Sequence, residues 1–163
     1  MNADPVDAIL AQWQKERPDL DVSAMGIVGR IGRLTKHLDR SLQEVFSEFG
    51  LQAGEFDVLA TLRRSGAPYQ LTPTTLFNAL MISSGTMTHR IDRLEQADLV
   101  QRIPDPSDRR GTLIQLTDKG LTLIEKAVEA HVANLNRLLS GLEAVESEAL
   151  AQLLRKLLIS FEG

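Results

Sequence analysis

The chain of 163 residues contains no cysteine. This absence excludes disulfide bonds, thiolate metal sites, thiol nucleophiles and cysteine-based redox sensing, and it fits a cytoplasmic location. Histidine is scarce as well: His37, His89 and His131 lie far apart and lack the paired spacing of a metal site. We therefore expect no metal and regard each histidine as a surface residue or as one satisfied by a neighbouring group.

Long hydrophobic runs are also lacking. No window reaches the ~18 consecutive apolar residues that a membrane span requires, and the N-terminal residues lack the basic start and apolar core of a signal peptide. The sequence also has no GxGxxG, P-loop or GxSxG motif. We expect no membrane association, no cofactor and no catalytic residue, although a catalytic carboxylate pair stays open as an alternative.

An excess of positive charge is the third absence. Lysine and arginine number 18 against 22 acidic residues, which gives a formal net charge of -4. The chain as a whole therefore does not attract nucleic acid, and any contact with DNA must come from a local surface. With 43% hydrophobic and 25% charged residues, the composition is that of a globular protein with one core.

What is present is mostly helical periodicity. Val6, Ile9, Leu10 and Trp13 form the apolar stripe of a short amphipathic helix that ends before Pro18. A second stripe runs from residue 25 to residue 49 and predicts a long helix, with a glycine at position 50 placed for a C-cap. Within that helix glycines recur every third residue, which indicates either close approach of another helix or local helix weakness. These glycines are Gly26, Gly29 and Gly32.

Three short helices are predicted next. The first starts near Glu55, with Phe56, Leu59 and Leu62 facing inward, and is closed by the breaker at residues 65–68. Thr72 as N-cap opens the second, and Ser83 or Ser84 caps the third. The third has its apolar stripe at Met87, Ile91 and Leu94. Three helices in close succession with short breaks favour a helix-turn-helix unit.

After Asp98 the pattern becomes strand, polar turn and strand, over residues 99–103, 104–111 and 112–116, which predicts a β-hairpin wing. Thr117 caps a last helical region that breaks near Gly141. The expected fold is mainly α with a small β wing. We divide it into an N-terminal helix and long dimerisation helix (1–50), a winged helix-turn-helix lobe (51–117) and C-terminal dimerisation helices (118–163), all within one compact subunit.

Two surfaces of this lobe are candidates for DNA binding. The polar face of the third helix suits base edges and phosphates, its N-terminus suits a phosphate, and a wing-tip arginine suits a minor groove while Asp108 holds the turn. Formal charge over residues 83–110 is zero, so binding depends on charge orientation and on dimerisation. An ordinary solvated surface is the alternative. The predicted residues are Ser83, Ser84, Thr86, Thr88, His89, Arg93, Asp108, Arg109 and Arg110.

The segments LTPTTLFNAL, SSGTMTHRIDRLEQADLV and PDPSDRRGTLIQLTDKG together resemble the MarR family of winged helix-turn-helix regulators. The resemblance covers nearly the whole chain. It implies a helical dimerisation layer formed by both chain ends and a homodimer that binds successive major grooves of a pseudo-palindromic operator, as a repressor. Asp98 departs from the glycine that the family commonly has at the end of the recognition helix, and we expect a slightly different junction there.

The segments QWQKERPDLDV and EFDVLATLRRSGAPY resemble the urate-responsive branch of that family. This resemblance implies a site for a small anionic, purine-like ligand at Trp13, Asp57, Arg90 and Arg102. A flat anion would stack on the indole and pair with arginine donors, and its charge would disturb the carboxylate. The alternative is that Trp13 anchors a core and that Asp57 forms a structural ion pair with Arg90 or Arg102.

These residues are compatible with three functions to different degrees. The favoured one is a ligand-responsive DNA-binding regulator whose partners are double-stranded DNA, a second copy of the chain and a urate-like ligand. A winged-helix protein-protein adaptor without sequence-specific DNA binding stays open because the lobe has no net charge. A small enzyme would require turnover that depends on Asp57, and no motif supports it.

Overall fold

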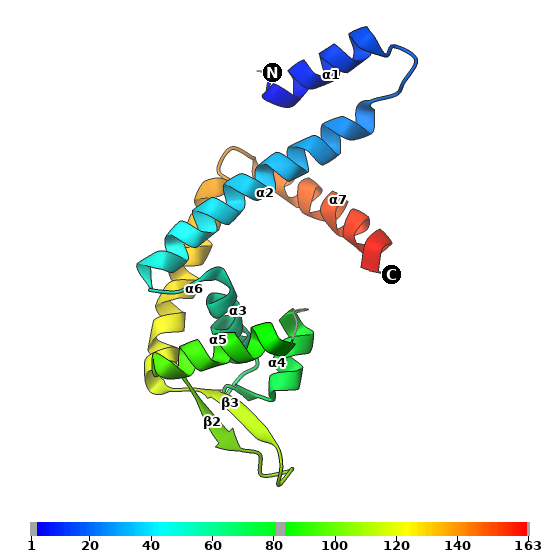
Figure 1. The fold of residues 1–163 in the computed structure, drawn as a ribbon. Coiled ribbons are helices and arrows are strands. Elements are labelled where there is room, and N and C mark those ends of the chain that lie inside the picture. Colours follow the sequence, from blue (N-terminus) through cyan, green and yellow to red (C-terminus); the bar gives the residue numbers. More distant parts are fainter. Residues whose placement is uncertain (1–2, 81–83, 163) are drawn as a thin grey trace. The chain divides into compact units, whose positions relative to one another are not determined.

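The computed structural model describes residues 3–80 and 84–162 and divides the chain into two compact units, residues 1–41 and residues 42–163. Figure 1 labels the elements. They are α1 (Pro5–Glu16), α2 (Ser23–Glu48), α3 (Ala53–Arg64), β1 (Gln70–Leu71), α4 (Pro73–Leu80), α5 (Ser84–Gln96), β2 (Val100–Pro104), β3 (Thr112–Leu116), α6 (Asp118–Leu138) and α7 (Ala144–Glu162).

The first unit consists of α1 and the N-terminal part of α2. Asp4 caps α1 because its side chain accepts hydrogen bonds from the backbone N–H groups of Val6 and Asp7, while the Asp7 side chain accepts one from Asp4 N. Arg30 of α2 donates to both carboxylates, at 2.8 Å to Asp4 and 2.6 Å to Asp7. The predicted short helix is thus present and tied to α2.

Two glycines of α2 face α1. A Cβ atom at Gly26 would lie 3.1 Å from Leu10 Cδ1, and one at Gly29 would lie 3.5 Å from Val6, which is buried. Close approach of α1 therefore accounts for Gly26, whereas a Cβ atom at Gly29 would make only an ordinary contact with Val6. A Cβ atom at Gly32 would meet nothing within 4 Å, so the third glycine of the series has no such role.

The second unit contains the winged helix. The three predicted helices of the helix-turn-helix are α3, α4 and α5, and the β2–β3 hairpin that extends from them is the predicted wing (Figure 1). Thr72 caps α4 as expected, because its Oγ1 accepts a hydrogen bond from Thr75 N at 3.0 Å. Ser83 lies outside the described residues.

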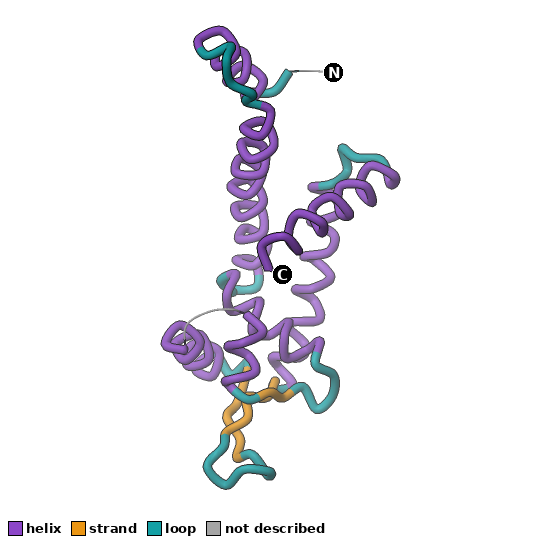
Figure 2. Tube along the Cα trace, turned by 90° about the vertical axis from the view of Figure 1, so that its right-hand side faces the viewer, coloured by secondary structure: helices purple, strands orange, loops and turns teal. Residues whose placement is uncertain are grey.

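One strand was not predicted. Gln70 and Leu71 form β1, which pairs with β3 opposite Gln115 and Ile114, so the sheet has three antiparallel strands in the order β1-β3-β2. Figure 2 shows these strands in orange between the helices and the loop at the tip of the wing. The sequence offered no signal for β1, because two residues after a turn are too few to show alternation.

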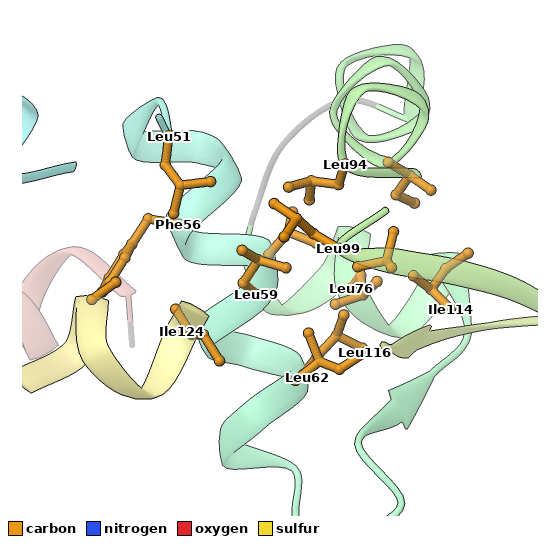
Figure 3. Close-up of a cluster of buried hydrophobic side chains, with 14 of the residues drawn as sticks. Leu51, Phe56, Leu59, Leu62, Leu76, Leu94, Leu99, Ile114, Leu116 and Ile124 are labelled. Atoms are coloured by element: carbon orange, nitrogen blue, oxygen red, sulfur yellow. The ribbon is translucent and has the colours of Figure 1, made fainter. Parts of the chain in front are cut away.

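The core of this unit surrounds α3 (Figure 3). Leu59 and Leu62 of α3 are fully buried and lie in one cluster with Leu76 of α4, Ile114 of β3 and Ile124 of α6. Burial of each such side chain stabilises the fold by about 1.5–3 kcal/mol. The inward residues predicted for α3 and α5 are confirmed as core: Phe56, Leu59, Leu62, Met87, Ile91 and Leu94.

The junction between α5 and the wing is held by hydrogen bonds from side chains of α6 and its N-cap to backbone carbonyl groups. Asp98 has φ 60, which lies in the left-handed region that favours glycine. Here an aspartate adopts that conformation. Thr117 Oγ1 donates to the Asp98 carbonyl at 2.7 Å and accepts from Gly120 N at 3.0 Å, which makes Thr117 the predicted N-cap of α6. Lys119 donates to the Ala97 carbonyl at 2.7 Å.

The C-terminal helices α6 and α7 are separated by the predicted break near Gly141. None of the described residues of α7 is buried, and its large apolar side chains are exposed in the single chain. Nowhere in residues 3–80 and 84–162 is a helix long and apolar enough to cross a membrane. The predicted fold class, mainly helical with a small β wing, is confirmed.

Candidate nucleic-acid interface

The outer face of α5 is polar. Met87, Ile91 and Leu94 are buried, whereas Thr86, Thr88 and His89 are exposed on the same helix. The apolar stripe predicted from the sequence therefore fixes the helix to the core and leaves these three predicted DNA-binding residues at the surface. Ser84 begins the helix, and its side chain is outside the described part of the structure.

The tip of the wing is shaped by two aspartates. Asp108 accepts a hydrogen bond from Arg110 N at 3.0 Å, and Asp105 accepts hydrogen bonds from the N–H and the hydroxyl of Ser107 at 2.8 and 2.7 Å. The hydrogen bonds from Ser107 hold the pKa of Asp105 below its usual value. Asp108 thus supports the turn, while the side chains of Arg109 and Arg110 are exposed. The Asp-x-Ser spacing was the overlooked signal for Asp105.

Arg93, another predicted DNA-binding residue, is engaged within the protein. Its Nε donates to Glu55 Oε1 at 2.6 Å, and Glu55 Oε2 accepts from Gln52 N at 2.8 Å in a capping box at the start of α3. Glu55 is only 4% exposed, whereas the Arg93 side chain is 44% exposed. Sequence reasoning missed Glu55, because the residue three positions before it is Gln52, which is not one of the usual N-cap residues Ser, Thr, Asp and Asn.

Arg102, one of the predicted ligand residues, joins the wing to α5. Its guanidinium contacts Asp92 at 2.5 Å and also Glu95, and its backbone N–H donates to Glu95 at 3.1 Å. The hydrogen bond that Arg102 donates to Asp92 raises the pKa of Arg102 above its usual value. Strand β2 is thereby fixed to the C-terminal half of the helix by charge-assisted hydrogen bonds.

Two other predicted ligand residues lie beside each other in the second unit. Burial raises the pKa of Asp57 above its usual value, and the positive charges of Arg90, Arg64 and His131 oppose that shift. Arg90 lies against the first turn of α3, because a Cβ atom built on Gly54 would overlap its guanidinium.

The fourth predicted ligand residue, Trp13, belongs to α1 in the first unit. Trp13 is 42% exposed in the single chain. An exposed indole is suited to stacking on a planar ligand.

An aromatic cluster that includes His131 lies close enough to Asp57 for the two residues to interact electrostatically. His131 of α6 packs on Phe46 and Phe56, which stack on each other with ring centroids 4.2 Å apart. Burial lowers the pKa of His131, and its Nδ1 is buried without a hydrogen-bond partner among the described residues. No local sequence pattern predicts this cluster, because its rings come from three different helices. Within residues 3–80 and 84–162 no group of three acidic or histidine side chains is arranged to hold a metal ion.

The lobe has a three-stranded sheet, a polar exposed face on α5 and a wing tip that carries arginines. This combination defines a winged-helix DNA-binding protein. The comparisons with known proteins agree. The model of the MarR family matches residues 51–112, which span the described part of the lobe from the start of α3 to the start of β3. The chain belongs to the MarR family of transcriptional regulators, whose members are not enzymes.

Three relatives illustrate the match. The HTH-type transcriptional regulator PecS of Dickeya dadantii is 50% identical over 149 residues, 91% of this chain and 90% of PecS. A mutant MarR from E. coli, solved in complex with operator DNA, has a TM-score of 0.71 and 28% identity, covering 90% of this chain and 97% of that one. BpsR of Bordetella bronchiseptica, in a structure titled for regulation of its DNA binding by 6-hydroxynicotinic acid, has a TM-score of 0.70 and 28% identity, covering 80% and 91%.

Proposed function

We propose that the protein is a homodimeric repressor that binds a pseudo-palindromic operator and is released from it by a small anionic, purine-like ligand such as urate. It would act in the cytoplasm. The observation that carries the DNA-binding part is the polar face of α5, which stands free of the core opposite its buried stripe. In this proposal α5 enters the major groove with Thr86, Thr88 and His89, and Ser83 and Ser84 bind a phosphate at its N-terminus.

The wing contributes the second contact. Arg109 and Arg110 would reach the minor groove or the phosphates beside it, from a turn that Asp108 holds in shape. Arg93 retains guanidinium donors beyond the Nε that binds Glu55, and these are available to a phosphate. Because the lobe has no net charge, two lobes acting together would supply the affinity that one lacks.

The homodimer is supported by the apolar side chains of the C-terminal helix. An exposed stripe of this size in a single chain is typical of a surface that a second copy covers. Together with the N-terminal helices it would form the dimerisation layer that the family resemblance implies. The exposed residues on α7 are Val145, Leu150, Leu153, Leu154, Leu157, Leu158, Ile159 and Phe161.

The ligand part of the proposal assigns Trp13, Asp57, Arg90 and Arg102 to an anionic aromatic molecule. The electrostatics of Asp57 support it, because Arg90 is one of the positive charges that act on this carboxylate and an arriving anion would compete for that charge. Arg102 would use donors not engaged by its two acidic partners. Release follows only if the ligand binds the conformation that has lost DNA more tightly than the DNA-bound conformation.

The experiment is a titration of the promoter region beside the gene with the full chain at several salt concentrations, with and without urate. We expect tight binding that weakens with salt and with urate. Arg110→Ala should reduce the salt dependence, whereas Lys126→Ala, the same charge change on an exposed position of α6, should not. Trp13→Phe should weaken the urate response. Binding indifferent to purines would remove the urate proposal, and no binding at low salt would favour the adaptor.

A further inference from the structure

The first turn of α3 contacts two arginines of the recognition helix α5. Gly54 lies under the guanidinium of Arg90, and the carboxylate of Glu55 binds Arg93. Arg90 and Arg93 are almost one helical turn apart, so consecutive residues of α3 contact consecutive turns of α5. We refer to Gly54 and Glu55 as the α3 seat.

Position 54 is a glycine because the Arg90 guanidinium occupies the space that a side chain would need. A Cβ atom on Gly54 would lie 2.5 Å from Arg90 Nη2 and would overlap the rest of the guanidinium. Glycine within a helix costs about 0.5–1 kcal/mol relative to alanine, so its presence needs a reason. Its φ is not in the left-handed region that would require glycine. The room left for Arg90 supplies that reason.

The glutamate of the seat holds the same helix from a buried position. Each Glu55 carboxylate oxygen accepts a hydrogen bond, one from Gln52 N at 2.8 Å and one from Arg93 Nε at 2.6 Å. Because the carboxylate is almost fully buried, it has little freedom to follow a moving arginine. Glu55 therefore holds Arg93 against α3, and Gly54 leaves the space in which the Arg90 guanidinium lies.

We propose that Gly54 is a positioning residue for the ligand response, because only a residue without a side chain lets Arg90 lie on α3 beside Asp57. This inference rests on the proposed function, in which Arg90 binds the anionic ligand. Any larger residue at position 54 displaces the guanidinium, which sits at the end of a flexible side chain and moves at little cost to folding. The ligand response is then lost while the DNA-binding surfaces keep their residues.

The test uses the full chain with urate as the probe, and compares wild type, Gly54→Ala, Arg90→Ala and the double variant. Gly54→Ala is expected to keep operator affinity within about twofold and to unfold at the same or a higher urea concentration, because alanine favours the helix. The urate concentration for half-release should rise roughly tenfold or more, the effect of losing a hydrogen bond to a charged group. The double variant should respond to urate like Arg90→Ala alone.

The controls separate the two ideas. Gly32→Ala places the same methyl group in a helix where nothing lies within 4 Å, and it should leave the urate response unchanged. A normal urate response in Gly54→Ala, with a lost response in Arg90→Ala, would overturn the Gly54 inference and leave the proposed function standing. A normal response in Arg90→Ala would remove Arg90 from the ligand site and the inference with it.

Folding provides a separate check. If Gly54→Ala is destabilised, adding Arg90→Ala should restore the unfolding midpoint, since the methyl group then meets no guanidinium. A double variant that is as unstable as Gly54→Ala would show that the glycine serves the backbone, and would also overturn the inference. The single tryptophan of the chain, Trp13, provides a fluorescence readout of urate binding without DNA.

Discussion

Replacing Arg93 by alanine tests whether the buried carboxylate of Glu55 depends on its partner. Breaking a fully buried ion pair costs about 3–5 kcal/mol, because the remaining charge is left uncompensated. Here the Arg93 side chain is 44% exposed, so water replaces part of the lost interaction, while the hydrogen bond from Gln52 N remains. We therefore expect Arg93→Ala to lower the free energy of unfolding by about 1–3 kcal/mol.

Glu55→Gln is the matched variant, since glutamine keeps the capping box and removes only the charge. We expect a smaller loss of about 1 kcal/mol, and a double variant whose loss is less than the sum of the two. Urea unfolding at one fixed protein concentration measures all three, because the midpoint of a dimer depends on concentration. Equal stability of Arg93→Ala and wild type, or fully additive losses, would refute the argument that Arg93 compensates a buried charge.

Three further predictions concern the core and its titrating groups. Leu59→Ala should cost about 2–5 kcal/mol in urea unfolding, because Leu59 is fully buried and leaves a cavity; a loss below 1 kcal/mol, far under that range, would place it outside the core. Since the folded pKa of Asp57 is raised, the folded state binds its proton more tightly, and the contribution of Asp57 to the unfolding free energy falls as pH rises above 3.8. Asp57→Asn should abolish that fall and stabilise the protein at neutral pH, and a destabilised variant there would contradict the raised pKa. His131 has a lowered pKa, so stability should fall as pH drops below 6.5, and His131→Leu should remove this loss.

The helices could be predicted from the sequence because their signals are local. Thr72 and Thr117 are N-caps that act on residues three positions away, and the stripe of Met87, Ile91 and Leu94 repeats within one helix. Strand β1 could not, because it exists only through pairing of Gln70 and Leu71 with a strand more than 40 residues further along the chain.

In the candidate site, too, some features could be predicted from local sequence patterns and others could not. The exposed face of α5 follows from periodicity, and the role of Asp108 in shaping the wing tip follows from turn chemistry. The contacts of Arg93 with Glu55 and of Arg90 with Gly54 require α3 to lie against α5, which no local pattern encodes. For the same reason Arg102 could be singled out only by family resemblance.

The ion pairs of Arg102 have a mechanical consequence. The guanidinium of Arg102 binds Asp92 and Glu95 of α5, and its backbone belongs to β2. These contacts couple the wing to the recognition helix, so the two move together. In the proposed mechanism, a ligand that tilts α5 would also move the wing tip. Major-groove and minor-groove contacts of one half-site are then broken in the same movement, so in the proposed mechanism a half-site has no state in which only the wing remains on the DNA.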